Sequence, residues 1–137
     1  MTRNCWSQKT ETGIEKFDSH YHMICDILDY IFASLNTDLS SDGSDILAAL
    51  YDYISHYCSD EELMMLENGF PDFVMHKLAH DEFLRNIDLR LKIIHANDAS
   101  VAETAMFIKT WLNLHIICED AKHVEYVKKQ KLKSSAR

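Results

Sequence analysis

The chain has 137 residues, 47% of them hydrophobic, and a formal net charge of −8. This length suits one domain with one core, and the negative charge argues against nucleic acid as a partner. No apolar run reaches the roughly 18 residues of a membrane span. No apolar signal segment stands at the start of the sequence either, so we expect a cytoplasmic protein.

Helix-forming segments fill most of the sequence, because proline occurs once and glycine only three times. Apolar residues recur at helical spacing in four stretches. The expected helices cover residues 17–35, 45–67, 71–95 and 100 to beyond 126. The expected joints are residues 36–44, 68–71 and 97–98. Ser100 with Glu103 forms a capping-box pattern for the last helix.

Four helices with short joints predict an all-α fold, an antiparallel up-down-up-down four-helix bundle. Residues 1–16 are expected to form an irregular N-terminal arm across it. The inward stripe of the second helix includes Tyr57 and Leu63, and that of the third includes Leu78 and Phe83.

A basic run follows the fourth helix. It contains Lys128, Lys129, Lys131, Lys133 and Arg137. We interpret residues 1–127 as the folded domain and residues 128–137 as a tail. The tail is either a solvated helix end whose cations suit the helix dipole, or a linker to a further domain.

Three pairs of metal-binding residue types lie on three of the predicted helices. The pairs are His56 with Asp60, His76 with His80, and His115 with Asp120. Residues four apart share one face of a helix. Imidazoles and carboxylates held on stiff helices that face one core predict a metal site, with donors for two ions.

Each pair alone is a weak signal, because surface histidines often produce such spacings. His115 and Asp120 are five residues apart, so they point about 140° apart on an ideal α-helix. By helix geometry alone Glu119 is the better partner of His115. The three pairs together predict a metal site in a bundle, and a bundle that binds zinc or no metal is the alternative.

These segments resemble motifs of the bacterial hemerythrins over roughly residues 6–123. The resemblance rests on His56 to Met64 (H-F-x-x-E-E-x-L-M), Phe70-Pro71 with His76, His80 and Phe83 (Y-P…H-x-x-x-H-x-x-F), Trp111 to Asp120 (W-L-x-x-H-I-x-x-x-D), and Trp6 with Thr12-Gly13-Ile14 (the N-terminal arm).

The resemblance implies a myohemerythrin-type bundle with two non-haem iron ions that bind dioxygen. It implies the following ligands: His76, His80 and His115 on one iron, His56 on the other, and Asp60 and Asp120 as bridges. It therefore selects Asp120 over Glu119. It also makes Trp111 and Leu112 candidates to line the oxygen pocket, although ordinary core packing explains them equally well.

Two departures from the family pattern fall on the same iron. The family motif G-I-x-x-I-D-x-Q-H-K ends in a ligand histidine, and the register places Tyr21 there, between His20 and His22. Tyr21 could bind as a phenolate, a local helix shift could bring in His20 or His22, or water could fill the position. We expect Tyr21 at or near the site, because register constrains a stiff helix. Asp60 is one methylene shorter than the family's bridging glutamate.

These departures argue against plain reversible oxygen carriage. We expect an oxygen or redox sensor that regulates an attached signalling domain through the basic tail. The alternatives are a di-iron enzyme acting on oxygen, peroxide or nitric oxide, and an oxygen or iron storage protein.

Overall fold

A computed structural model describes residues 12–35, 43–93 and 98–135, and these contain helices but no strand. The expected N-terminal arm lies mostly outside the described residues. In chain order the helices are α1 (Glu15–Ser34), α2 (Gly43–Asn68), α3 (Phe73–Ile93), α4 (Asp98–His115), the π-helix η3 (Ile116–Asp120) and α5 (Ala121–Ser135).

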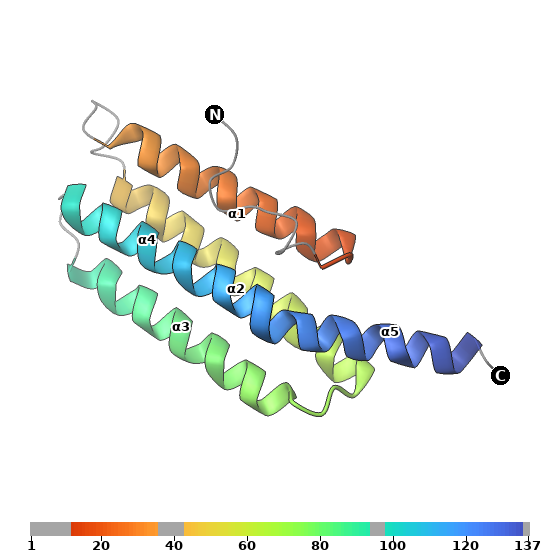
Figure 1. Cartoon of the computed structure of the whole chain (residues 1–137). Helices are drawn as coiled ribbons and strands as arrows, with labels where there is room; N and C mark the ends of the chain where they lie inside the picture. The colour runs from red at the N-terminus through yellow and green to blue at the C-terminus, as the bar shows by residue number, and fades with distance from the viewer. Residues whose placement is uncertain (1–11, 36–42, 94–97, 136–137) are drawn as a thin grey trace.

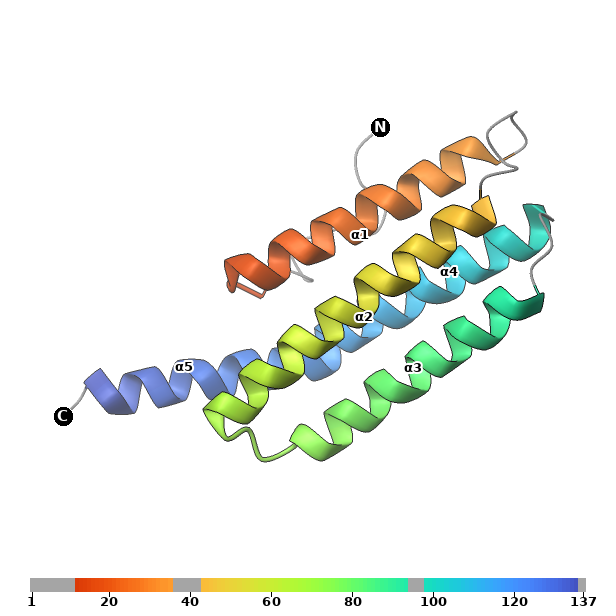
Figure 2. The ribbon, with the colours of Figure 1, turned by 180° about the vertical axis from the view of Figure 1, so that it is seen from behind.

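The helices form four rods that run alternately up and down (Figure 1). The last rod is composite, because α4, η3 and α5 follow one another without a break. The view from behind shows the same antiparallel order, with α5 projecting beyond the other rods (Figure 2). The prediction of an all-α four-helix bundle is confirmed.

The apolar core fills the space between the rods. Its fully buried members include Ile24, Leu28, Leu50, Ile54, Ile87 and Ile108. Because neighbouring rods are antiparallel, the C-terminal half of α2, the N-terminal half of α3 and the C-terminal end of α4 meet at one end of the bundle. Polar side chains replace apolar ones in the core at this end.

Two residues expected in the core are exposed instead. Leu63 and Leu78 are each 56% exposed. At this level of the bundle the inward positions of α2 and α3 are occupied by Glu61, His76 and His80, which are buried. Apolar periodicity therefore misassigned these helix faces where polar residues point inward.

The described helix ends follow the predicted joints, although several are shifted by about two residues. Gly69 follows α2 in the left-handed conformation, with φ +64°, and the Phe70 N–H donates to the Met65 carbonyl at 2.9 Å. This is the glycine stop that the sequence predicts. However, α3 begins at Phe73 rather than Pro71, and α4 begins two residues before the expected cap at Ser100.

The last helix continues through the basic segment as far as Ser135, so the expected tail boundary at residue 128 falls inside α5. Its lysines at 128, 129, 131 and 133 are exposed. None of the described helices has the length and apolar character that a membrane span requires.

Candidate metal centre

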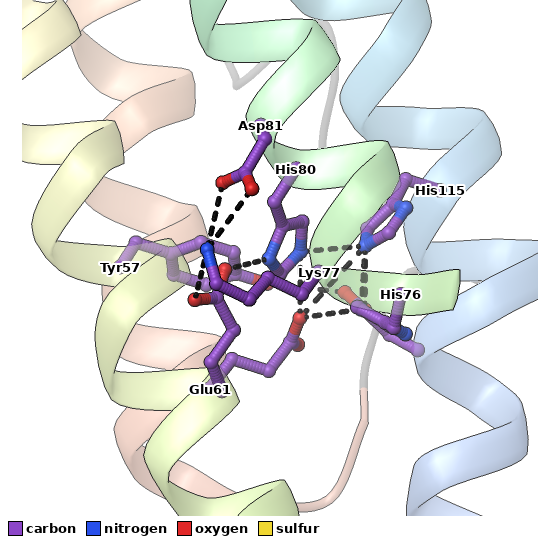
Figure 3. Close-up of polar contacts among 9 residues, drawn as sticks. Tyr57, Glu61, His76, Lys77, His80, Asp81 and His115 are labelled. Carbon is purple, nitrogen blue, oxygen red and sulfur yellow. Dashed lines mark hydrogen bonds and ion pairs between the residues drawn. The ribbon is translucent and has the colours of Figure 1, made fainter. Parts of the chain in front are cut away.

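Five buried side chains from three rods converge at this end of the bundle. They are Glu61 from α2, His76 and His80 from α3, His115 from α4 and Asp120 from η3. One potential ligand atom from each lies within 4.8 Å of all the others. Figure 3 shows the three imidazoles turned toward Glu61. This concentration of nitrogen and oxygen donors makes the cluster a candidate metal site.

The spacing of the donors matches the coordination sphere of one ion. The Nε2 atom of His115 lies 2.8 Å from Nε2 of His76 and 2.9 Å from Nε2 of His80. Glu61 Oε1 lies 2.8 Å from His76 Nε2 and 3.0 Å from His80 Nε2. An octahedral ion with bonds of about 2.1 Å holds neighbouring donors about 3.0 Å apart.

Hydrogen bonds alone cannot satisfy this arrangement. Nε2 of His76 faces Glu61 and His115 at 2.8 Å and Asp120 at 3.0 Å, yet it carries only one proton or one lone pair. Among the described residues, Oδ1 of Asp120 finds no hydrogen-bond donor in suitable geometry, although two imidazole nitrogens lie 3.0 Å away. A cation among these atoms would satisfy them all, so the residues fit a bound metal ion.

The charges in the cluster are strongly coupled. Burial lowers the pKa of His76, but the adjacent carboxylates of Asp120 and Glu61 outweigh it and raise the pKa to about 9. Burial also lowers the pKa of His80, and hydrogen bonds to Cys58, Glu61 and Glu62 raise it to about 12. Burial raises the pKa of Glu61, but the three imidazoles hold it well below its usual range. Protons therefore balance the carboxylates when no metal does.

Outer contacts orient two of the donors. Nδ1 of His80 lies 2.7 Å from Glu62 Oε2, and the other oxygen of this carboxylate, Oε1, lies 3.8 Å from Lys77 Nζ. A carboxylate on the outer nitrogen turns the Nε2 lone pair toward the cluster, as in carboxylate–histidine–metal arrangements. On the other side, the Tyr57 hydroxyl donates to Asp120 Oδ2 at 3.2 Å.

Two neighbouring groups stay protonated. Burial, with the charges of Asp120 and Glu61, raises the pKa of Tyr57 well above its usual value, so the phenol is a hydrogen-bond donor at neutral pH. Burial also raises the pKa of the Cys58 thiol beside His80. The clustered donors are therefore imidazoles and carboxylates rather than thiolates.

The π-helix explains how Asp120 reaches the site. Ala121 N–H bonds to the Ile116 carbonyl, five residues back, so the chain is underwound between His115 and Asp120. Residues five apart then share a face, and Asp120 Oδ1 lies 3.0 Å from His115 Nε2. Glu119, the better partner on an ideal α-helix, instead pairs with Lys122 at the surface.

The structure does not bring His56 and Asp60 into the cluster. His56 is exposed, and its Nδ1 lies 2.8 Å from the Asp52 carbonyl one turn earlier. The Asp60 side chain is 36% exposed and lies 3.4 Å from Lys16 Nζ and 3.5 Å from His20 Nε2. Neither side chain belongs to the group of clustered donors.

The first-helix candidates are also engaged elsewhere. Tyr21 is buried, and its hydroxyl donates to Asn113 of α4. Nδ1 of His20 lies 2.8 Å from the Tyr53 hydroxyl. His22 lines a surface hollow beside Ser19. None of these three residues belongs to the group of clustered donors.

Sequence reasoning missed Glu61, which lies one residue after Asp60. Its signal was the buried stripe of α2, which includes Ile54, Tyr57, Glu61 and Met65 at spacings of three or four. Tyr57 and Glu61 are four apart on this stripe, and His56 and Asp60 are one residue off it. Matching the motif by residue type rather than by helix face selected the wrong side of the helix.

A groove of about 520 Å³ reaches His115 from the surface. Met75, Ala79, Trp111, Leu114 and Cys118 line most of it. Trp111 stacks on the His115 ring with centroids 4.4 Å apart, whereas Leu112 is buried in the core. Of the two expected pocket residues, Trp111 therefore lines an opening beside the cluster.

The fold and donor set define a metal-binding protein of the four-helix-bundle class. The chain is 30% identical to the bacteriohemerythrin of Methylococcus capsulatus over 106 residues, which are 77% of the chain and 81% of that relative. It is 26% identical to the bacteriohemerythrin of Clostridium acetobutylicum over 126 residues, 88% of the chain and 98% of the relative. The chain belongs to the bacterial hemerythrin family. No protein-family model matches it.

Replacing His76 is expected to abolish tight metal binding, whereas replacing His56 is not. His76→Ala removes a buried donor, so its metal affinity should fall by more than the roughly 10–100-fold typical of losing an outer-shell partner. His56→Ala, the matched control, removes an exposed imidazole of α2 that lies outside the cluster. Competition with a chelator measures both affinities. Equal losses in the two variants would place His56 in the site.

Raising the pH should have opposite effects on the metal-free and metal-binding states. The pKa of His76 is raised from 6.5 to about 9 in the folded chain, so its stabilisation is complete below about 6.5 and disappears as the pH approaches 9. The urea midpoint of the metal-free protein should therefore fall across this range. Metal affinity should rise instead, because fewer protons compete for the imidazoles. His76→Gln should flatten the stability profile, and an unchanged profile would contradict this assignment.

Proposed function

We propose that this chain is a non-haem iron domain that binds dioxygen and acts as an oxygen or redox sensor. The observation that carries the proposal is the convergence of three imidazoles and two carboxylates in the core of a hemerythrin-family bundle. Hemerythrins bind dioxygen. The coordinating residues are proposed to be Glu61, His76, His80, His115 and Asp120.

Iron bound here supplies reversible one-electron redox chemistry and affinity for dioxygen. The chain supplies position, burial and charge. Glu62 orients His80, and Tyr57 orients Asp120 through its hydroxyl. Two carboxylates among the donors favour ferric over ferrous iron, because the attraction between a buried cation and each negative ligand grows with the charge of the cation.

The groove beside His115 suits a small uncharged ligand. Its lining is mostly apolar, with Met75, Trp111 and Leu114 exposed or half-buried along it. Apolar walls admit a neutral diatomic molecule without a desolvation cost. The stacking of Trp111 between Phe83 and His115, with centroids 3.8 Å and 4.4 Å away, keeps the ring beside the opening.

The composite rod α4–η3–α5 supports a sensing role. Two proposed ligands, His115 and Asp120, flank the π-helix, and the same rod continues as the exposed basic helix α5. A π-helical segment can change its hydrogen-bonding pattern locally, and such segments are frequent at functional sites. A change in donor spacing would therefore rotate or shift α5, where an attached signalling domain or a separate partner would detect it.

Exposure of the ferrous protein to dioxygen is expected to change its absorption spectrum and its backbone dynamics. The absorption change should saturate with dissolved dioxygen, and Glu61→Ala should lose it because iron binding is lost. Hydrogen exchange should differ between the ferrous and oxidised states in η3 and α5. The part of α1 around Ile24 and Leu28 is the internal control and should exchange equally in both states.

Zinc-loaded protein serves as the redox-inert control and should show neither change. Absence of any dioxygen response in iron-loaded protein would reject the proposal. Identical exchange in η3 and α5 would reject the sensing role alone, and sustained turnover of peroxide or nitric oxide would favour an enzyme.

A further inference from the structure

We propose that the site is built for one metal ion, with the Tyr57 hydroxyl bonded to Asp120 where a second ion would bind. The resemblance to hemerythrins implies two irons, but the described residues do not supply donors for both. This inference rests on the proposed iron site and is independent of dioxygen binding.

The donors form a single coordination sphere. Six separations between them, among the nitrogens of His76, His80 and His115 and the nearer oxygens of Glu61 and Asp120, lie between 2.8 and 3.0 Å. All five donor atoms fit within 4.8 Å. Paired metal ions lie about 3.5–4 Å apart, and each needs its own terminal donors. The terminal donors of a second ion would therefore have to come from residues outside the five clustered ones.

The carboxylate that would bridge to a second ion has its other oxygen occupied. Asp120 directs Oδ1 toward His76 and His115, and its Oδ2 accepts a hydrogen bond from Tyr57 at 3.2 Å. Tyr57 is 1% exposed and packs its ring edge-on against Phe17, with centroids 6.1 Å apart. The phenol therefore fills the space on the α1 side of Asp120 with a packed ring.

None of the other described histidines belongs to the group of clustered donors. The remaining described histidines are His20, His22, His56 and His123. His20 faces Tyr53 and Asp60, and His56 is exposed. Nε2 of His123 lies 3.4 Å from the Asn68 amide, and its ring packs against Phe70.

The geometry assigns Tyr57 a positioning role. By holding Asp120 Oδ2, the hydroxyl turns Oδ1 toward the imidazoles. Five protein donors then leave one position of an octahedral ion for water or a small ligand, and that position is where an external molecule would bind.

Metal titration of the full chain tests the number of ions. Cobalt(II) and anaerobic ferrous iron, titrated separately, should each saturate at one ion per chain. The oxidised iron form should show the electron paramagnetic resonance of an isolated high-spin ferric ion. Two ions per chain with either metal, or the silent spectrum of a coupled ferric pair, would overturn the proposal. Cobalt binding without any iron–dioxygen response would leave this inference standing and reject only the proposed function.

Tyr57→Phe tests the positioning role. The variant keeps the ring but removes the hydroxyl, so it should still bind one ion, with affinity lowered about 10–100-fold and an altered ferric resonance. Tyr53→Phe is the matched control, since it removes a hydroxyl one turn earlier that faces His20 instead. Unchanged affinity and resonance in Tyr57→Phe would overturn the assignment. A phenolate charge-transfer band lost in Tyr57→Phe would also overturn it, because Tyr57 would then be a ligand.

Discussion

The structure depends on satisfying a group of buried charges at one end of an otherwise apolar bundle. Glu61 and Asp120 are each 1% exposed, and the three imidazoles around them are 4% exposed or less. Burying carboxylates is costly unless opposite charge compensates them. Protons on the imidazoles provide this positive charge in the metal-free chain. A bound metal ion would provide it instead. Metal binding is therefore proton release, and the same contacts set the stability of the metal-free chain and its affinity for metal.

The core at the opposite end allows this arrangement. Leu28, Leu50, Ile54 and Ile87 pack the rods together without polar groups, so apolar packing supports the alignment of the rods away from the site. Donors held on stiff, packed helices keep their spacing when the charge between them changes. The exception is η3, where the backbone departs from α-helical hydrogen bonding inside the donor set. A change in donor spacing at the site would consequently move the rod formed by α4, η3 and α5 more than the other rods.

The sequence predicted the four-helix fold and four of the five clustered residues, but not Glu61. His76 and His80 lie four apart on a regular α-helix, so their spacing predicts their common direction, and α3 keeps that geometry. Asp120 could not be derived from spacing, because the π-helix that turns it inward leaves no simple pattern of residue types. Glu61 could have been found from the stripe that contains Tyr57. It was missed because two adjacent acidic residues both matched the motif, and only the helix face distinguishes them.

The phenol of Tyr57 on the inward face of α2 affects what the site can do. An imidazole at position 57 would offer a lone pair to a second ion, whereas the phenol offers a proton to Asp120. In the proposed one-ion site, Asp120 would bind the ion through Oδ1 while Oδ2 accepts the hydrogen bond from Tyr57. A pair of irons that cycle between the ferrous and ferric states can exchange two electrons with a ligand, whereas a single iron cycling between these states exchanges one. The proposed site for one non-haem iron therefore agrees better with reporting redox state than with oxygen carriage, and the two proposals support each other.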